Sequence, residues 1–364
     1  MASRETDISS IGEFGLIDRI RKIIGDGPRG IDASNHLVLG ISDDAAVFRP
    51  TPGKVQILTT DTFAEGVHFD LTFTSMRHLG WKVMAASLSD IAAMGGIPRF
   101  ATVAISLPGK ITVPMVEELY SGIAASMKAY SYIVVGGDTT GSAGNMAVTV
   151  SMTGEADERH LLFRRGAVPG DYLCVSGHLG SSIAGLKVLQ REKARHSSEK
   201  DPGEFRPNLG PYAAALEKHF MPKPRFDLIA LITDRVRVNS MIDISDGLAS
   251  EVHHLCRESG VGAAVHEHNL PLEGVTQRIA AEFGDAATDY ALLGGEEYEL
   301  LFTLSDGEYA KLGEFTEDVS IVGRIVEKEK GITYVREDGT SVPLVRGGWD
   351  HFTPKGPGHD DRRD

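Results

Sequence analysis

The chain has 364 residues, of which 41% are hydrophobic and 24% are charged, and its formal net charge is −14. A chain of this length exceeds what one hydrophobic core usually spans, so two domains are the default expectation. The composition argues against global disorder, and the negative charge argues against nucleic acid or an anionic membrane surface as the main partner.

The first part of the chain predicts one helix, then strands with two further helices between them. Apolar residues at helical spacing predict a helix at 12–24, and the Gly- and Asp-rich residues 25–36 read as a loop. Short apolar runs predict strands at 37–39, 55–58, 101–107, 132–135 and 146–150. The two further helices are expected at about 76–94, ending at Gly95-Gly96, and at about 113–130, with Pro114 near the start.

The pattern begins again after Gly154, so the change of domain is expected near 155–165. Strands are predicted at 172–175, 241–244, 300–304 and 321–326, and helices at 182–190 and 248–259. Residues 191–210 read as an exposed polar excursion, and the tail from Pro354 reads as disordered. We therefore divide the chain into 1–157, 158–353 and a tail at 354–364.

Two further features of the sequence bear on the cellular compartment in which the protein works. The apolar surroundings of Cys174 and Cys256 predict buried core residues rather than a disulfide or a metal pair. No segment approaches the roughly 18 uninterrupted apolar residues of a membrane span, and the N-terminus has no signal-peptide pattern. We expect a cytoplasmic protein with no membrane partner.

Several aspartates follow apolar runs, among Gly, Ser and Thr residues. They are Asp43, Asp44, Asp61, Asp138, Asp243 and Asp246. Ligand sites of α/β proteins form at the ends of strands, and Mg²⁺ is held by a few carboxylates together with phosphates and water. A single aspartate in this context is more often a turn or N-cap residue, whereas six together favour a ligand site.

Asp90 lies inside the helical pattern 76–94, where aspartate is unfavourable. It either occupies a solvated polar face or is held there by a ligand. The glycines Gly136, Gly137, Gly177 and Gly180 either make turns or cradle phosphate through backbone N–H groups. No Walker A loop, G-x-G-x-x-G or H-R-D motif is present, so the common kinase classes are excluded.

The motifs, in this order, resemble the thiamine-monophosphate kinase family of the aminoimidazole ribotide synthetase superfamily. They are GEFGLI (12–17), GISDDAAVF (40–48), TTDTFAEGVHF (59–69), SLSDIAAMGG (87–96), VVGGDTTG (134–141), RRGAVPGD (164–171), IDISDGL (242–248), LLGGEEYELLFT (292–303) and GWDHF (348–352). The resemblance implies a two-domain α/β (α+β) fold. It also implies a homodimer whose N-terminal domains form a shared sheet or barrel.

The resemblance also implies roles for individual residues. The expected Mg²⁺ ligands are Asp43, Asp44, Thr59, Thr60, Asp61, Asp90, Asp138, Asp243 and Asp246. The expected ATP contacts are Tyr120, Gly137, Asp138, Arg164 and Ser245. The expected thiamine-phosphate contacts are His68, Glu296, Glu297 and Trp349. Asp44, Asp61, Asp138 and Asp246 would form the catalytic centre.

Some alternatives stay open at this stage. His68 is otherwise a hydrogen-bonded structural histidine, and Trp349 a C-terminal core anchor. The family's usual GDD is here Ser42-Asp43-Asp44, and its usual GGEDYEL has Glu297 in place of aspartate, which leaves open whether Glu296 or Glu297 faces the substrate.

The implied reaction is direct in-line phosphoryl transfer from ATP to thiamine monophosphate with several Mg²⁺ ions. The acceptor is a phosphate monoester with a second pKa of about 6, so no strong general base is needed. The alternatives are another ATP-dependent synthetase of the same superfamily, or a non-catalytic divalent-ion-binding protein. No EF-hand loop is present, which weakens the second alternative.

Overall fold

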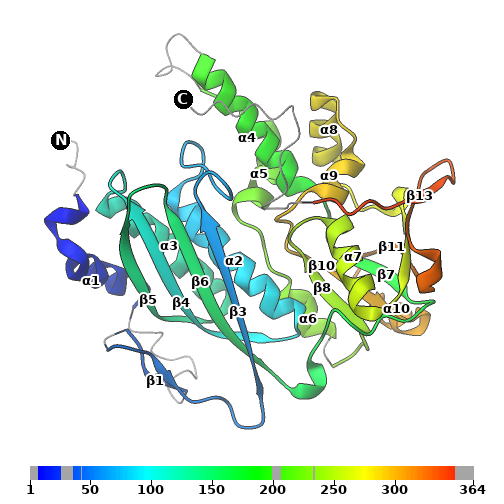
Figure 1. The fold of residues 1–364 in the computed structure, drawn as a ribbon, viewed down its shortest axis with the longest axis horizontal. Coiled ribbons are helices and arrows are strands. Elements are labelled where there is room, and N and C mark those ends of the chain that lie inside the picture. The colour runs from blue at the N-terminus through cyan, green and yellow to red at the C-terminus, as the bar shows by residue number, and fades with distance from the viewer. Residues whose placement is uncertain (1–6, 26–35, 42, 199–205, 233, 349–364) are drawn as a thin grey trace.

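The computed structural model describes residues 7–25, 36–41, 43–198, 206–232 and 234–348. Two sheets with their helices lie side by side, and they correspond to the two halves of the sequence (Figure 1). The first sheet ends at Ala156 and the second begins at Tyr172. The boundary at 157/158 falls between them, and we keep this division as a proposal.

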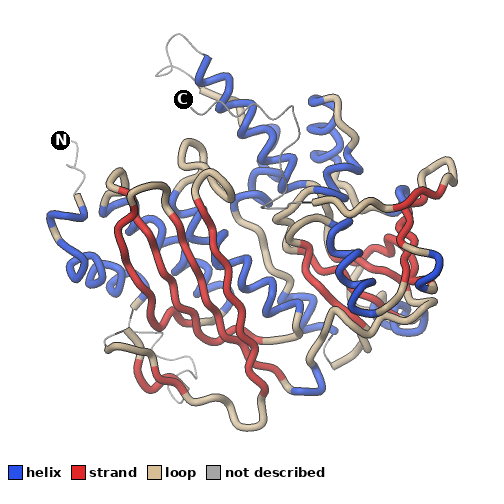
Figure 2. The backbone as a smooth tube through the Cα atoms, in the orientation of Figure 1, coloured by secondary structure: helices blue, strands red, loops and turns tan. Residues whose placement is uncertain are grey.

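The N-terminal half is a four-stranded sheet with helices on one face, as Figure 2 shows. Its strands are β3 (Val55–Ala64), β4 (Ile97–Pro108), β5 (Ile133–Ser142) and β6 (Ala147–Ala156), in the order β3-β6-β4-β5. Its helices are α1 (Gly12–Ile24), α2 (Met76–Ala93) and α3 (Val113–Tyr130). Only β4 and β5 are parallel.

The two faces of this sheet differ in chemistry. Alternate residues such as Val103 and Val150 are buried in the core shared with α2 and α3. The opposite face carries hydroxyl side chains, among them Thr60, which hydrogen-bonds Ser151. The hairpin of β1 (Leu37–Leu39) and β2 (Val47–Phe48) packs on part of that face, where Phe48 contacts Phe100. This alternation decides which side chains can meet the helices.

The C-terminal half is a seven-stranded, mostly antiparallel sheet. Its strands are β7 (Tyr172–Ser176), β8 (Ser240–Ile244), β9 (Gly262–His266), β10 (Glu299–Leu304), β11 (Val319–Val326), β12 (Ile332–Val335) and β13 (Ser341–Pro343), in the order β13-β12-β9-β11-β7-β10-β8. Its helices are α4 (Ser181–Ser198), α5 (Ala213–Phe220), α6 (Phe226–Ile232), α7 (Leu248–Ser259), α8 (Gly274–Phe283), α9 (Ala287–Leu293) and α10 (Asp306–Leu312).

Helix α2 joins the two halves. It packs on the first sheet and also contacts β8 and α5 (Figure 1). Trp81 Nε1 donates a hydrogen bond to the Pro222 carbonyl at 2.8 Å, and Ser89 Oγ donates to Asp243 at 2.8 Å. Almost all of its side chains are buried, because α2 has a neighbour on both sides.

Most predicted elements are confirmed, including the helices at 12–24, 76–94 and 113–130 and the buried, unpaired cysteines. One expectation was wrong, and one helix is longer than expected. Asp61 and Asp138 do not follow strands but lie within β3 and β5, because pairing with β6 and β4 continues past the apolar runs. The helix expected at 182–190 continues to Ser198, so the first residues of the predicted exposed excursion at 191–210 are helical, and most of them are exposed. The tail at 354–364 lies outside the described residues.

None of the helices in the described ranges is long and apolar enough to cross a bilayer.

Candidate functional site

Three carboxylates from separate elements lie close together where α2 runs between the two halves. Asp61 comes from β3, Asp90 from the last turn of α2 and Asp243 from β8. Each accepts a hydrogen bond from a hydroxyl: Ser87 donates to Asp61 at 2.5 Å, Thr59 donates to Asp90, and Ser89 donates to Asp243. We call Asp61, Asp90 and Asp243 the carboxylate cluster.

The electrostatics of the cluster show that the three charges repel one another. Burial, and then the neighbouring Asp61, raise the pKa of Asp90 to about 6. Burial, and then the charges of Asp90 and Glu251, raise the pKa of Asp243, and burial also raises that of Asp61. Arg164 lowers the pKa of both Asp90 and Asp243. Arg164 therefore lies near the cluster, although it only partly offsets the negative charge.

This donor set fits a hard divalent cation. The ligand atoms are carboxylate and hydroxyl oxygens, which Mg²⁺ prefers, and the excess negative charge is partly buried. Within the described ranges, no three or more Asp, Glu, His or Cys side chains already surround a single point in metal-binding geometry. Mg²⁺ usually takes one or two protein carboxylates and completes its shell with water and phosphate.

The structure places Asp138, Gly137 and Thr60 apart from the cluster. In the sheet register Asp138 pairs with Ala104, which pairs with Thr149, so Asp138 lies on the hydroxyl-bearing face. Asp61 pairs with Val150 on the opposite, helix-covered face. β6 and β4 also separate β3 from β5. Within one protomer, Asp138 and Asp61 therefore do not share a site.

The remaining predicted Mg²⁺ ligands lie on two turns. Asp43 and Asp44 are exposed just before β2, and the Asp44 N–H donates to Asp43 Oδ1. Asp246 and Ser245 follow β8, so they lie at the end of the strand that carries Asp243. The Asp246 N–H donates to the buried Glu251, which fixes this turn at the start of α7.

The two adjacent glutamates of the acidic motif point in different directions. Glu296 Oε2 accepts a hydrogen bond from Lys82 of α2 at 2.7 Å, and its side chain is partly exposed. Glu297 is fully buried, and its Oε1 accepts from the Ser182 N–H at 2.9 Å. Of the two, Glu296 alone can reach a ligand from its observed position.

The other predicted contacts are dispersed. His68 is half-buried and its Nδ1 accepts from the Ala64 N–H at 3.1 Å, so its ring is oriented by its own turn. Tyr120 is buried in the N-terminal core, where burial raises its pKa. Trp349 lies outside the described residues. Gly348 precedes it with φ +117, and a side chain there would meet the Asp246 carbonyl at 2.3 Å.

Lys82 and Tyr298 contribute to the site but were missed by sequence reasoning. Lys82 is the only charged residue in the apolar stretch WKVMAASL of α2, which was an available signal. Tyr298 has φ +52 and Glu296 has φ +62, conformations that cost on the order of 1–3 kcal/mol each outside glycine. Tyr298 is buried, and burial, then the charges of Glu296 and Asp61, raise its pKa.

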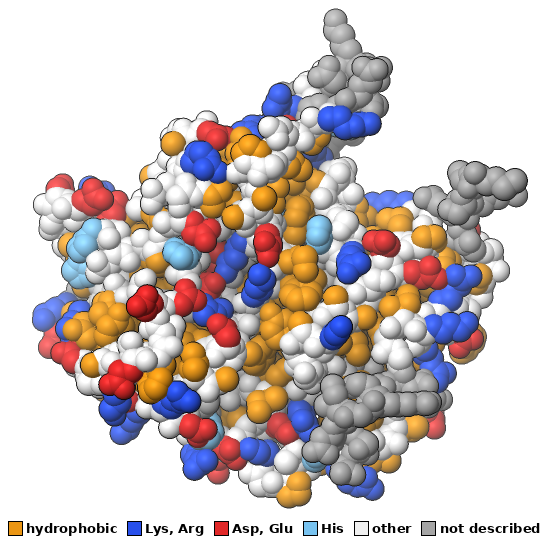
Figure 3. Space-filling model, turned by 180° about the vertical axis from the view of Figure 1, so that it is seen from behind, with side chains coloured by type: hydrophobic (Ala, Val, Ile, Leu, Met, Phe, Trp, Pro, Cys, Tyr) orange, Lys and Arg blue, Asp and Glu red, His pale blue; other side chains and the backbone are white. Residues whose placement is uncertain are grey.

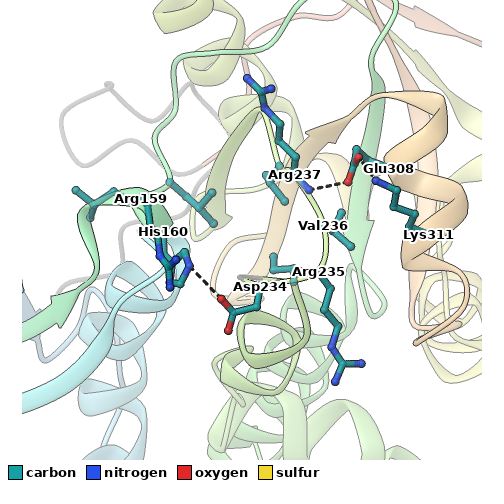
Figure 4. A pocket seen from close by; sticks show the side chains of 12 residues that line it. Arg159, His160, Asp234, Arg235, Val236, Arg237, Glu308 and Lys311 are labelled. Atoms are coloured by element: carbon teal, nitrogen blue, oxygen red, sulfur yellow. Dashed lines mark hydrogen bonds and ion pairs between the residues drawn. The ribbon is translucent and has the colours of Figure 1, made fainter.

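The larger of two cavities described lies away from the cluster. Its volume is about 460 Å³, and it is lined by residues between the two sheets and around α10, among them His160, Asp234 and Lys311. Figure 4 shows that the Arg235 and Arg237 side chains point to opposite sides, while Asp234 pairs with His160. The cations here do not converge on one ligand position.

Comparison with known proteins places both halves in one family. The model for AIR synthase related protein, N-terminal domain, matches residues 42–156, and that for the C-terminal domain matches 168–336. The thiamine-monophosphate kinase of Bacillus subtilis is 33% identical over 93% of this chain and 99% of its own length. That of Aquifex aeolicus is 34% identical over 95% of this chain and 99% of its own.

Solved structures give the same result. The thiamine-monophosphate kinase of Stenotrophomonas maltophilia K279a is 30% identical, with a TM-score of 0.75 over 91% of this chain and 98% of its own. AaThiL complexed with AMPPCP and TMP is 31% identical, with a TM-score of 0.71 over 96% of this chain and 100% of its own. HypE of E. coli, a hydrogenase maturation protein, shares the fold at 18% identity and a TM-score of 0.70, over 92% of this chain and 97% of its own. The expected two-domain fold is confirmed.

Proposed function

The chain belongs to the thiamine-monophosphate kinase family of AIR synthase related proteins, and on this premise we propose that it phosphorylates thiamine monophosphate with ATP and several Mg²⁺ ions. That family is one of kinases, and one solved relative holds AMPPCP and TMP together. The carboxylate cluster is the observation that carries the proposal, because buried, mutually repelling aspartates are suited to holding metal ions.

The mechanism assigns the reaction centre to Asp61, Asp90 and Asp243. These three carboxylates would hold Mg²⁺, which would supply positive charge to offset the repulsion between two phosphate-bearing anions. Ser87, Thr59 and Ser89 each occupy one lone pair of a carboxylate and so orient the remaining ones. Arg164, beside the cluster, neutralises phosphate oxygens of ATP. The acceptor phosphate is largely ionised at pH 7, so transfer is direct and in line.

The substrate contacts lie around this centre. Glu296 faces the thiamine portion of the substrate, and His68 positions the substrate rather than removing a proton. Trp349, the next residue after Gly348, remains a proposed substrate contact. An indole face against a cationic thiazolium stabilises it by roughly 1 kcal/mol or more. Tyr120, Gly137 and Ser245 remain the proposed ATP contacts, and Asp43, Asp44, Thr60 and Asp246 remain proposed metal ligands.

A homodimer accounts for the position of Asp138. β3 and β5 are the two edges of the first sheet, each is ten residues long, and Leu58 on β3 is 74% exposed. Open edges of this length pair readily with a second chain. Pairing β3 of one protomer with β5 of its partner brings the strand that carries Asp138 beside the strand that carries Asp61, so a site at this junction draws residues from both chains. The enzyme therefore works as a dimer, in the cytoplasm, with each site built from two chains.

Product formation tests the function. Purified protein is incubated with ATP, Mg²⁺ and thiamine monophosphate, and ADP and thiamine diphosphate are quantified with and without EDTA. We expect equal amounts of both products and none with EDTA. ATP consumption without thiamine diphosphate, when other acceptors are supplied, would instead indicate a different synthetase of the superfamily.

A further inference from the structure

Lys82 occupies an unusual environment for a lysine. Its side chain is 2% exposed and projects from the middle of α2, among buried apolar residues. Lysine is almost never fully buried without a partner. Here the partner is Glu296, 214 positions further along the chain and on the other half of the molecule. The pair is therefore a specific contact between the two halves.

Glu296 is held by this contact in a defined orientation. Its backbone N–H donates to the Ser245 carbonyl at 2.7 Å, and its φ of +62 is unfavourable for a residue with a side chain. Oε2 receives Lys82 Nζ at 2.7 Å, with His219 Nδ1 at 4.0 Å. No described residue donates a hydrogen bond to Oε1. Oε2 of Glu296 is therefore fixed by Lys82, and Oε1 is left as a hydrogen-bond acceptor on a partly exposed side chain.

Tyr298 connects this acceptor to the carboxylate cluster. Two residues beyond Glu296, it leaves the turn with φ +52 and places its side chain in the N-terminal core. Its backbone N–H donates to the Ile244 carbonyl at 2.8 Å, next to Asp243, so the turn that carries Glu296 is fixed at the end of the strand that contributes to the cluster. The site thus has two ends. At one end the carboxylate cluster is suited to metal-bound phosphates, and at the other end lies the oriented carboxylate of Glu296.

From this arrangement we infer that Lys82 is a positioning residue for recognition of the second substrate. It fixes Oε2 of Glu296, so that Oε1 accepts a hydrogen bond from the exocyclic amino group of the substrate's aminopyrimidine, while the phosphate lies at the carboxylate cluster. Lys82 itself does not touch the substrate. This inference rests on the proposed function, because it concerns the thiamine-phosphate end of the same site.

The test compares Lys82→Met, Lys82→Arg, Glu296→Gln and the Lys82→Met/Glu296→Gln pair in the product assay. Trp81→Phe is the matched control, because it removes the neighbouring contact between α2 and the C-terminal half, at Pro222, without touching Glu296. We expect Lys82→Met to raise the KM for thiamine monophosphate about tenfold or more, the range for a lost charge-assisted hydrogen bond. The KM for ATP should stay within about twofold of wild type, as should both constants of Trp81→Phe.

Further outcomes separate positioning from a structural role. Lys82→Arg should restore most of the affinity, and the double variant should be no worse than Glu296→Gln alone, because Lys82 acts through Glu296. Additive losses, or equal rises in both KM values, would overturn the inference. If Lys82→Met does not fold, Glu296→Gln decides: an unchanged KM for thiamine monophosphate contradicts the inference. A wild-type protein that makes no thiamine diphosphate contradicts the proposed function itself.

Discussion

At the scale of single residues, neighbouring acidic groups take different roles because their surroundings differ. Glu296 faces Lys82 and the site, whereas Glu297, the next residue, is enclosed in the C-terminal half. Burial raises the pKa of Glu297 to about 7, although Lys218 nearby lowers it. Among the residues that the structure describes, its Oε2 has no hydrogen-bond partner. Glu297 therefore bears on stability, whereas Glu296 is the one of the two that we propose for ligand binding.

This difference predicts a pH dependence of stability. The folded-state pKa of Glu297 lies above its unfolded value, so its stabilising contribution is complete below pH 4.5 and is lost as the pH rises through about 7. Glu297→Gln keeps the acceptor for the Ser182 N–H but does not titrate. Relative to wild type, this variant should gain about 3 kcal/mol of unfolding free energy between pH 4.5 and pH 8.

Urea unfolding at both pH values measures this gain. The exposed Glu314→Gln variant serves as control and should follow the wild-type pH dependence. A gain in Glu297→Gln no larger than the control's would mean that Glu297 is already ionised without cost in the folded protein.

At the scale of elements, α2 determines the geometry of the site. It carries Lys82, Ser87, Ser89 and Asp90, and it packs against α3 through glycine contacts. A side chain on Gly122 of α3 would meet the Arg77 carbonyl of α2 at 2.0 Å, and one on Gly80 would meet the Leu119 carbonyl at 2.0 Å. The close approach of the two helix backbones therefore depends on both glycines.

Gly122→Ala should force α2 and α3 apart. In a helix this substitution normally stabilises by up to about 1 kcal/mol, whereas overpacking costs about 1–3 kcal/mol. We expect a net loss of unfolding free energy of about 1–2 kcal/mol, measured by urea denaturation. Gly274→Ala at the start of α8, where a side chain meets no atom within 4 Å, should show no loss. Equal stability of the two variants would show that the helix pair tolerates separation.

Local sequence patterns predicted some features of the fold correctly, whereas features that depend on long-range contacts could not be predicted from them. The end of α2 shortly before Gly95-Gly96 and the unusual Asp90 were predicted from residues within a few positions of one another. The full lengths of β3 and β5 did not, because pairing with β6 and β4 extends them through Thr and Gly residues. The pairing of Lys82 with Glu296 spans 214 positions, and no local pattern encodes it.

At the scale of the whole molecule, the net charge is −14, and on the face seen in Figure 3 acidic and basic side chains are interspersed. The proposed site instead depends on the partly buried carboxylate cluster between the halves. The homologous kinases span this chain almost end to end, which agrees with a site that needs both halves. The proposed contribution of Asp138, on the far face of the first sheet, rests on the proposed dimer.

A mixing experiment tests most directly whether phosphoryl transfer occurs at a carboxylate site built by two protomers. Asp61→Asn and Asp138→Asn are purified separately, shown to be folded and dimeric, and assayed for thiamine diphosphate before and after exchange of subunits. Each variant alone should be inactive. A mixed dimer has one doubly substituted site and one intact site, so an equal mixture should recover about a quarter of the wild-type rate. A mixture as inactive as its parents, or near-normal activity in either parent, would contradict the account.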